Sequence, residues 1–298
     1  MYKKLKKYFP SLQSYETIPS ELDSDFTWFM AENGRIVGID TEELTDKDEA
    51  LLTMFLEPFD DVFPQITEEE KKWRKFVQTK EDHVDVDMQV DFRFIYFRIP
   101  SELLTPLSFK SALNQLFQKE TIILWESKTD GVIVDMKQDE LKEFISFNEI
   151  IDILISDLYS KVRFFVGPYL SSLEQVKNYY DRIIEQADVA LSYSENNVVS
   201  YLEAIPYFII EQIQPELKEE LLNVTLKEFQ DDGEFIRMVE VLLKNDLNIS
   251  VAAKKLYLHR NSLLYRVEKF AEKTGLDIRK FHDALIVYFV LLANKNLS

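Results

Sequence analysis

The 298-residue sequence predicts an α+β protein that ends in an all-helical domain. Two observations predict this class. Before Pro215, apolar runs joined by Asn-Gly or Asp-Gly, which are typical of β-hairpins, are set between stretches with helical spacing of apolar residues. After Pro215, every periodic stretch has helical spacing. This mixed order favours an α+β sandwich over a doubly wound parallel sheet.

The first predicted region, residues 1–80, mixes helices and strands. A hairpin is expected around Asn33-Gly34, because Asn-Gly readily takes positive φ at both turn positions. A helix is expected over 45–57, with its first threonine as N-cap. A second helix is expected from Thr67, and the three glutamates after this threonine suit the positive end of the helix dipole. We therefore interpret this acidic triplet as a helix start, not as a metal site.

The second predicted region, residues 88–215, alternates strands and helices. The expected elements are a strand at 92–99, a helix at 109–117, a hairpin at Asp130-Gly131, a helix at 139–158, a strand at 161–168, a helix at 172–191 and a short strand at 196–202. Just before the first strand, His83, Asp85 and Asp87 alternate and would share one face of a strand. Such a row suits a divalent cation, but metal sites normally recruit ligands from more than one element. We favour a solvated linker or a charged edge strand.

The composition excludes several classes of function. There is no cysteine, which excludes disulfides, thiol nucleophiles and thiolate metal sites and fits a reducing, cytoplasmic location. The basic N-terminus is not followed by the apolar core of a signal peptide. The longest apolar run, 284–293, is too short to cross a bilayer, so no membrane partner is expected.

The third predicted region, residues 232–298, differs from the rest in charge. From Glu234 to the end the chain has 11 Lys and Arg against 7 Asp and Glu, a net +4, while the remaining residues have 24 against 46, a net −22. A basic domain on an acidic body is expected where one part binds a polyanion, although a short segment can also reach this balance by chance.

This basic region carries a helix-turn-helix pattern. We expect Ser250 to cap a helix over 251–256, a tight link over 257–259, and a second helix over 260–273 that stops at Gly275. In the second helix Leu263, Val267 and Phe270 share one face, which must be the buried one.

The opposite face presents Asn261 and Tyr265, whose polar atoms suit base edges in a major groove. Arg260 and Arg266 flank the buried face and suit phosphates. The candidate DNA-contacting residues are Lys254, Lys255, His259, Arg260, Asn261, Ser262, Tyr265, Arg266 and Lys269.

Structural roles remain open for several of these residues. Arg266 is equally suited to pair with an acidic neighbour in the fold. His259 can cap the second helix or bind a phosphate, and Tyr265 can be a partly buried surface aromatic. The last helix, which contains residues 284–293, is either core or a dimer surface, and its apolarity favours core.

The segment from Ala253 to Val267 resembles the C-terminal helix-turn-helix of the PucR/CdaR family of transcriptional regulators, whose hallmark reads approximately A-x-x-L-x-V-H-R-N-T-L-x-Y-R-L. Ser262 replaces the usual Thr, and Leu258 and Val267 are apolar exchanges. The usual Asn-Gly-Asn lead-in is here 246–248, Asp-Leu-Asn, so a turn of different shape is expected.

Upstream, the segment 166–191 is similar to part of the middle domain of these regulators, which is related to diguanylate cyclases. The resemblance implies an N-terminal mixed α/β region in a sensory position, a cyclase-like (GGDEF-like) α+β middle domain and an all-α C-terminal domain. In cyclases the hairpin carries G-G-[DE]-E-F, whereas residues 127–132 keep one glycine and one aspartate. No catalytic residue, metal or cofactor is therefore expected.

The leading interpretation is a sequence-specific DNA-binding transcriptional regulator of PucR/CdaR type that is not an enzyme. Its expected partners are a double-stranded DNA operator, a second copy in a homodimer and a small-molecule effector. The alternative is a non-enzymatic protein-interaction or ligand-binding adaptor whose helix-turn-helix does not bind DNA.

Overall fold

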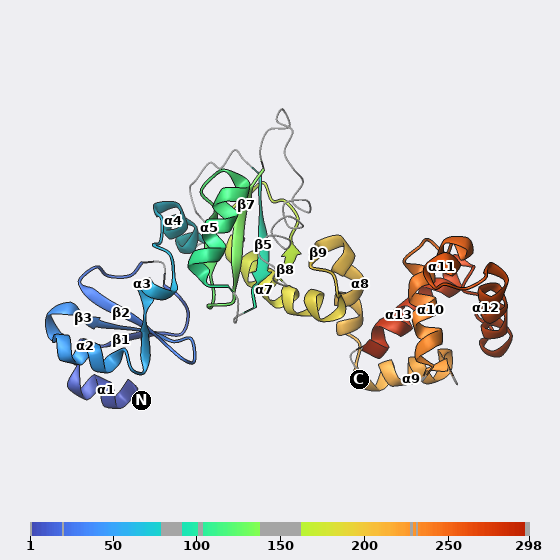
Figure 1. Ribbon diagram of the computed structural model, residues 1–298, viewed down its shortest axis with the longest axis horizontal. Coiled ribbons are helices and arrows are strands. Elements are labelled where there is room, and N and C mark those ends of the chain that lie inside the picture. The colour runs from blue at the N-terminus through green and yellow to red at the C-terminus, as the bar shows by residue number, and fades with distance from the viewer. Residues whose placement is uncertain are drawn as a thin grey trace. The chain divides into compact units, whose positions relative to one another are not determined.

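The computed structural model describes residues 2–19, 21–78, 91–100, 104–137, 162–226, 229–230 and 232–295. The chain divides into two compact units, Met1–Tyr201 and Leu202–Ser298 (Figure 1). Unit 1 mixes strands and helices and unit 2 is helical, which confirms the α+β class. The division into parts 1–80, 88–215 and 232–298 stays a prediction. None of the described helices is long and apolar enough to cross a membrane.

The first part of unit 1 is a four-stranded antiparallel sheet with short helices. Its elements are α1 (Tyr2–Tyr8), β1 (Gln13–Tyr15), β2 (Phe26–Ala31), β3 (Ile36–Asp40), the 3-10 helix η1 (Thr41–Glu43), α2 (Asp46–Leu52), β4 (Leu56–Pro58), α3 (Phe59–Val62) and α4 (Glu68–Gln78). The strand order is β1-β3-β2-β4. The hairpin around Asn33-Gly34 is confirmed, but only Gly34 has positive φ, at 80°.

The helix starts in this part are confirmed, but one predicted helix end is wrong. Thr45 caps α2 in a capping box with Asp48, as Thr67 caps α4 with Glu70. The helix predicted over 45–57 ends at Leu52, because the next apolar residues are used by the sheet. Leu56 pairs with Ala31 of β2 and buries its side chain there.

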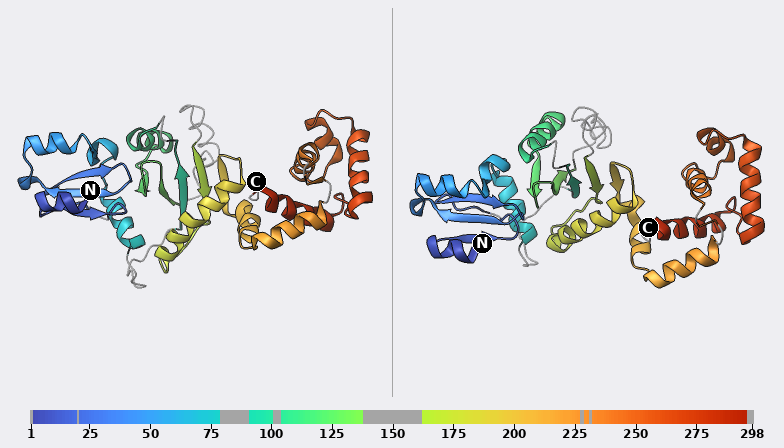
Figure 2. Two further views of the ribbon diagram at one scale, coloured as in Figure 1. Left: turned by 90° about the horizontal axis from the view of Figure 1, so that it is seen from below. Right: turned by 60° about the horizontal axis from the view of Figure 1, so that its bottom comes forward.

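The second part of unit 1 is a five-stranded sheet. Its elements are β5 (Phe92–Arg98), α5 (Pro106–Phe117), β6 (Ile122–Trp125), β7 (Asp130–Met136), β8 (Arg163–Val166), α7 (Val176–Tyr193) and β9 (Val198–Ser200). The order is β6-β7-β5-β8-β9, with only the β8–β9 pair parallel. Figure 2 shows this sheet between α5 on one side and α7 on the other. The helix predicted over 139–158 lies outside the described residues.

The second hairpin is confirmed, but its turn is not at Asp130-Gly131. These two residues begin β7, and the chain turns before them, where Glu126 and Ser127 donate backbone hydrogen bonds to the carbonyl of Asp130. A side chain at Gly131 would meet the carbonyl oxygen of Leu124 at 2.7 Å. The glycine is thus required by the close approach of β6, since its φ is not positive.

Unit 2 consists of helices, and all but the first of them contribute to one apolar core. They are α8 (Tyr201–Glu211), α9 (Pro215–Thr225), α10 (Gly233–Leu243), α11 (Ile249–Lys255), α12 (Arg260–Thr274) and α13 (Phe281–Lys295). The last helix, α13, packs against α9 and α10 and buries Val287, Val290 and Leu291 in this core. The helix therefore belongs to the core, which is the alternative that its apolar sequence favoured over a dimer surface.

Candidate nucleic-acid interface

The first helix of the helix-turn-helix, α11, begins two residues earlier than the sequence predicted. Its N-cap is Asn248, whose side-chain oxygen accepts hydrogen bonds from the backbone N–H groups of Ser250 (3.1 Å) and Val251 (3.2 Å). The prediction of Ser250 as N-cap is wrong, because Asn248 already satisfies the first free N–H groups of the helix.

This assignment makes a stability prediction. Replacing Asn248 by alanine should lower the free energy of unfolding by about 1 kcal/mol, since two helix donors lose their partner. Replacing Ser250 by alanine should change it by less than about 0.5 kcal/mol. Chemical denaturation of the two variants measures the difference, and an equal loss in both would contradict the assignment.

The turn between the two helices is a Schellman motif. Tyr257 takes a left-handed conformation at φ 56° and donates its N–H to the carbonyl of Lys254 at 3.2 Å, while Leu258 donates to Ala253 at 2.9 Å. The Tyr257 side chain is 98% exposed. The turn therefore ends α11 sharply and leaves a large aromatic side chain in solvent at the edge of the candidate interface.

The lead-in to α11 also differs from the family pattern. Asp246 and Leu247 both have positive φ, at 53° and 60°, where the family has a glycine in the middle position. Leu247 donates its N–H to the carbonyl of Leu242 at 3.0 Å and packs partly buried against the core. The expected change of shape is thus a left-handed turn held by an apolar side chain.

The second helix, α12, is held by its predicted face. Leu263, Val267 and Phe270 are fully buried, and Ala252 and Ala253 of α11 pack into the same core. Phe270 packs against two rings, with its centroid 4.8 Å from that of Phe235 and 5.2 Å from that of Phe229. Gly275 ends the helix at φ 84°, as expected.

The opposite face of α12 is open to solvent (Figure 1). Arg260, Asn261 and Ser262 are exposed, and Tyr265 is 65% exposed, which excludes the partly buried alternative for this tyrosine. Lys269 is exposed four residues after Tyr265 and so follows the same face.

The two helices carry a segment that is free of acidic residues. No Asp or Glu occurs between Asp246 and Glu268, and this segment contains two lysines and two arginines. Lys254 and Lys255 are exposed at the end of α11, directly before the turn. The cationic surface is therefore concentrated on the end of α11 and the first half of α12, where recognition helices meet base edges.

Two candidates have structural partners. The ring Nδ1 of His259 accepts a hydrogen bond from the N–H of Asn261 at 3.4 Å, so His259 is the N-cap of α12. Arg266 donates to Glu234 of α10 at 2.7 Å. The acidic-neighbour alternative for Arg266 thus describes a contact that is present. Sequence reasoning missed this carboxylate, which lies 32 residues away, and also missed the exposed Arg237 on the same helix.

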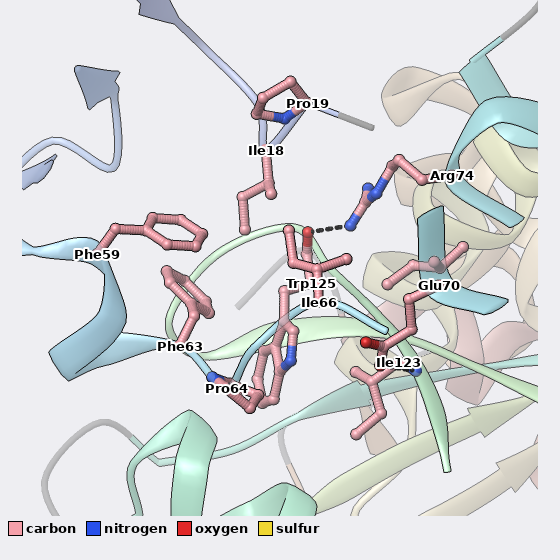
Figure 3. Close-up of a pocket in the computed structure, with 11 residues that line it drawn as sticks. Ile18, Pro19, Phe59, Phe63, Pro64, Ile66, Glu70, Arg74, Ile123 and Trp125 are labelled. Carbon is pink, nitrogen blue, oxygen red and sulfur yellow. Dashed lines mark hydrogen bonds between the residues drawn. The ribbon is translucent and has the colours of Figure 1, made fainter. Parts of the chain in front are cut away.

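Unit 1 has a small pocket of about 20 Å³, between α3, α4 and β6 (Figure 3). Figure 3 shows Trp125 between Phe63 and the carboxylate of Glu70. Glu70 is buried and accepts hydrogen bonds from Lys110 (2.8 Å) and the N–H of Ile123 (2.9 Å), while Arg74 donates to the carbonyl of Trp125 at 2.6 Å. Each of these ionic groups has a partner within the protein, since Glu70 pairs with Lys110 and Arg74 pairs with Glu126. The pocket is also far below the roughly 300 Å³ of small-molecule sites, so we assign it to the core.

The described residues contain no group of three or more acidic or histidine side chains placed to hold a metal ion. The row His83, Asp85 and Asp87 lies outside the described residues. The acidic triplet that follows Thr67 opens α4, as expected.

Comparison with known proteins gives one family match. Residues 235–293 match the PucR C-terminal helix-turn-helix domain, which confirms the resemblance of this segment. The matched range contains α11, α12 and most of α10 and α13.

Three relatives are similar to longer parts of the chain. Over 276 residues it is 28% identical to "Uncharacterized protein YxkF" of Bacillus subtilis (strain 168), covering 90% of this chain and 91% of that protein. Over 298 residues it is 24% identical to "Leucine-rich protein" of Streptococcus dysgalactiae subsp. equisimilis, covering 97% and 99%. Over 178 residues it is 25% identical to "DNA-binding transcriptional activator AdeR" of Bacillus subtilis (strain 168), covering 57% and 40%.

Proposed function

We propose that this chain, whose C-terminal helices form a PucR-type helix-turn-helix domain, is a sequence-specific DNA-binding transcriptional regulator of PucR/CdaR type. The observation that carries the proposal is the exposed first half of α12, which has no carboxylates. The opposite, apolar face of the helix is buried and holds it in position. A relative named as a DNA-binding transcriptional activator supports it.

In this proposal each exposed side chain has a role that follows from its chemistry. Asn261 offers both a donor and an acceptor to a base edge, and Arg260 offers a planar fork to a guanine or a phosphate. Tyr265, one turn later, contacts the groove wall or a base edge. Lys254, Lys255 and Lys269 supply sequence-independent attraction to phosphates. His259 orients the start of the helix through its cap.

The experiment that tests the function is genome-wide mapping of the DNA sites bound by the chain. A regulator of this type gives a shared sequence motif at the bound sites. Binding without any shared motif would remove the claim of specific recognition. The mapping also reports the symmetry of the site, and two related half-sites would support the homodimer that we propose, because one helix reads only a few base pairs.

The electrostatic part of the proposal makes a salt prediction. Each phosphate contact should lower the affinity about threefold for a fourfold rise in salt concentration, because the counterion that it displaces gains less entropy when it is released into a more concentrated solution. Titrations of a labelled duplex at several salt concentrations measure the slope. A slope near zero would contradict phosphate contacts by these lysines and arginines.

We further propose that the second part of unit 1 is a degenerate GGDEF-like domain without catalytic activity. The chain order strand, helix, hairpin, strand, helix, strand over residues 92–200 and the sheet order β6-β7-β5-β8-β9 resemble a ferredoxin-like arrangement with one added strand. Asp130 accepts a hydrogen bond from the hydroxyl of Ser127 in its own turn, so it acts there as a turn residue. The relatives named as regulators agree with a non-enzymatic role.

The small-molecule effector stays a proposal without an assigned site. The adaptor alternative would leave the cations scattered away from Asn261 and Tyr265. In this chain Lys254, Lys255 and Arg260 instead lie within the 11 residues before Tyr265 and are all exposed. This grouping favours DNA as the partner.

A further inference from the structure

A surface hollow of about 220 Å³ lies beside the recognition helix, between α10 and the turn that joins α11 to α12. Its charged lining comes from three separate elements: Glu234 and Arg237 from α10, Lys255 from α11 and Arg266 from α12. Tyr257 of the turn forms part of its wall. The hollow thus collects three cations and one carboxylate from helices that are distant in sequence.

The carboxylate is the weakly held member of this set. Glu234 accepts a hydrogen bond from Arg266 at 2.7 Å, but its side chain is 72% exposed and that of Arg266 is 37% exposed. Surface ion pairs of this kind contribute little to stability. Glu234 also lies in the first turn of α10, after the N-cap Asp232, so its side chain can turn into solvent without disturbing the core. An anion that binds Arg266 more tightly can therefore replace the Glu234 carboxylate.

We propose that this hollow binds one backbone phosphate of DNA, and that Arg237 of α10 is a phosphate contact outside the two helices of the helix-turn-helix. In the bound state Arg266 exchanges the Glu234 carboxylate for the phosphate, with Arg237 and Lys255 completing the site. The inference rests on the proposed function, because it places the phosphate next to a helix lying in the major groove.

The chemistry of the lining selects a phosphate. Two guanidinium groups offer planar pairs of donors that match two oxygens of one phosphate, and an ammonium group adds a point charge. The hollow also adjoins Arg266, which is one residue from the outward-facing Tyr265, so a phosphate at the groove edge reaches it while α12 contacts bases.

The test uses the full chain and a duplex of arbitrary sequence, because a phosphate contact does not depend on sequence. Arg237→Ala should weaken binding several-fold and lower the slope of log affinity against log salt by about 1. Glu234→Gln should strengthen binding several-fold, because it removes a carboxylate that competes for Arg266. Both side chains are exposed, so neither change should alter folding, which circular dichroism checks.

The matched control is Lys244→Ala, which removes a cation from the exposed C-terminal end of the same helix but outside the hollow. It should keep the salt slope of the unmodified chain. Equal losses in Arg237→Ala and Lys244→Ala would overturn the site, since they would report only the net charge of the domain. Unchanged binding by Arg237→Ala would overturn it as well, and weaker binding by Glu234→Gln would overturn the exchange at Arg266.

These outcomes are separable from failure of the proposed function. If the arbitrary duplex shows the Arg237 effect while genome mapping finds no shared motif, specific recognition fails and the phosphate site stands. If the chain binds no duplex at all, both fail. A titration of the unmodified chain with inorganic phosphate, followed by the NMR signals of arginine side chains, tests whether the hollow is instead a site for free phosphate. Saturation at millimolar phosphate that also displaces no DNA would overturn the backbone assignment.

Discussion

The double variant Arg260→Ala, Asn261→Ala should remain folded and lose affinity for its operator by on the order of 1000-fold. Each good contact of this kind to a base edge contributes about 1 to 3 kcal/mol of discrimination. Both side chains are exposed, and alanine keeps the backbone N–H of residue 261 that His259 caps. Binding energy is therefore removed while the helix start is retained.

The measurement is a titration of a duplex taken from a mapped site, with an arbitrary duplex alongside. Loss on the operator should exceed loss on the arbitrary duplex, because base contacts carry the specificity. A matched control is Arg35→Ala, Asn33→Ala, which removes the same two residue types from the β2–β3 turn of unit 1. Its operator affinity should equal that of the unmodified chain. Unchanged affinity in the Arg260, Asn261 variant would remove α12 as the recognition helix.

Much of this interface could be predicted because it depends on local spacing. Leu263, Val267 and Phe270 recur at helical intervals, and that pattern alone fixes which face of α12 is buried. Gly275 and the capping threonines likewise act within one turn of their own helix. Where the physical cause lies within a few residues, most of the expected and observed elements agree, and the N-cap of α11, which is Asn248 and not Ser250, is an exception.

Two other errors have the opposite cause, since each depends on a contact with a neighbouring strand. The sequence pattern continues the helix from Thr45 past Leu52, because nothing local shows that Leu56 pairs with β2. The Asp-Gly pair predicts a turn at Gly131, whereas the close carbonyl of Leu124 decides the position of this glycine. Tertiary pairing overrode local propensity at both places.

The same limit applies to the candidate site. Exposure of Asn261 and Tyr265 follows from helix geometry, but the contact of Arg266 with Glu234 joins two helices across 32 residues. The sequence offered an acidic partner for Arg266 only as a possibility, and Arg237 had no local feature that set it apart. The hollow that unites these side chains exists only once α10 packs against α12.

Phe270→Ala should lower the free energy of unfolding of unit 2 by about 3 to 5 kcal/mol. The side chain is 0% exposed and its ring packs against those of Phe229 and Phe235, so truncation leaves a cavity and breaks two aromatic contacts. Typical domains are stable by only about 5 to 15 kcal/mol, so this loss is a large fraction of the total.

Two spectroscopic signals separate the units in this experiment. All three tryptophans, Trp28, Trp73 and Trp125, lie in unit 1, so their fluorescence follows its unfolding. Far-ultraviolet circular dichroism also includes the helices of unit 2. In Phe270→Ala the circular dichroism transition should move to lower denaturant, while the fluorescence transition stays in place. The control Phe281→Ala removes a phenylalanine that is 78% exposed. It should change the free energy of unfolding of either unit by no more than about 0.5 kcal/mol.

The Phe270→Ala variant also tests what holds α12 in its position for DNA binding. Removing the Phe270 side chain should weaken operator binding together with the stability of unit 2, whereas removing the Arg260 and Asn261 side chains should abolish binding with no change in unfolding. The two results together would assign separate roles to the two faces of one helix: the buried face sets its position and the exposed face reads the bases. If Phe270→Ala left the stability of unit 2 unchanged, the aromatic cluster would not hold α12, and the position of Asn261 and Tyr265 would need another cause.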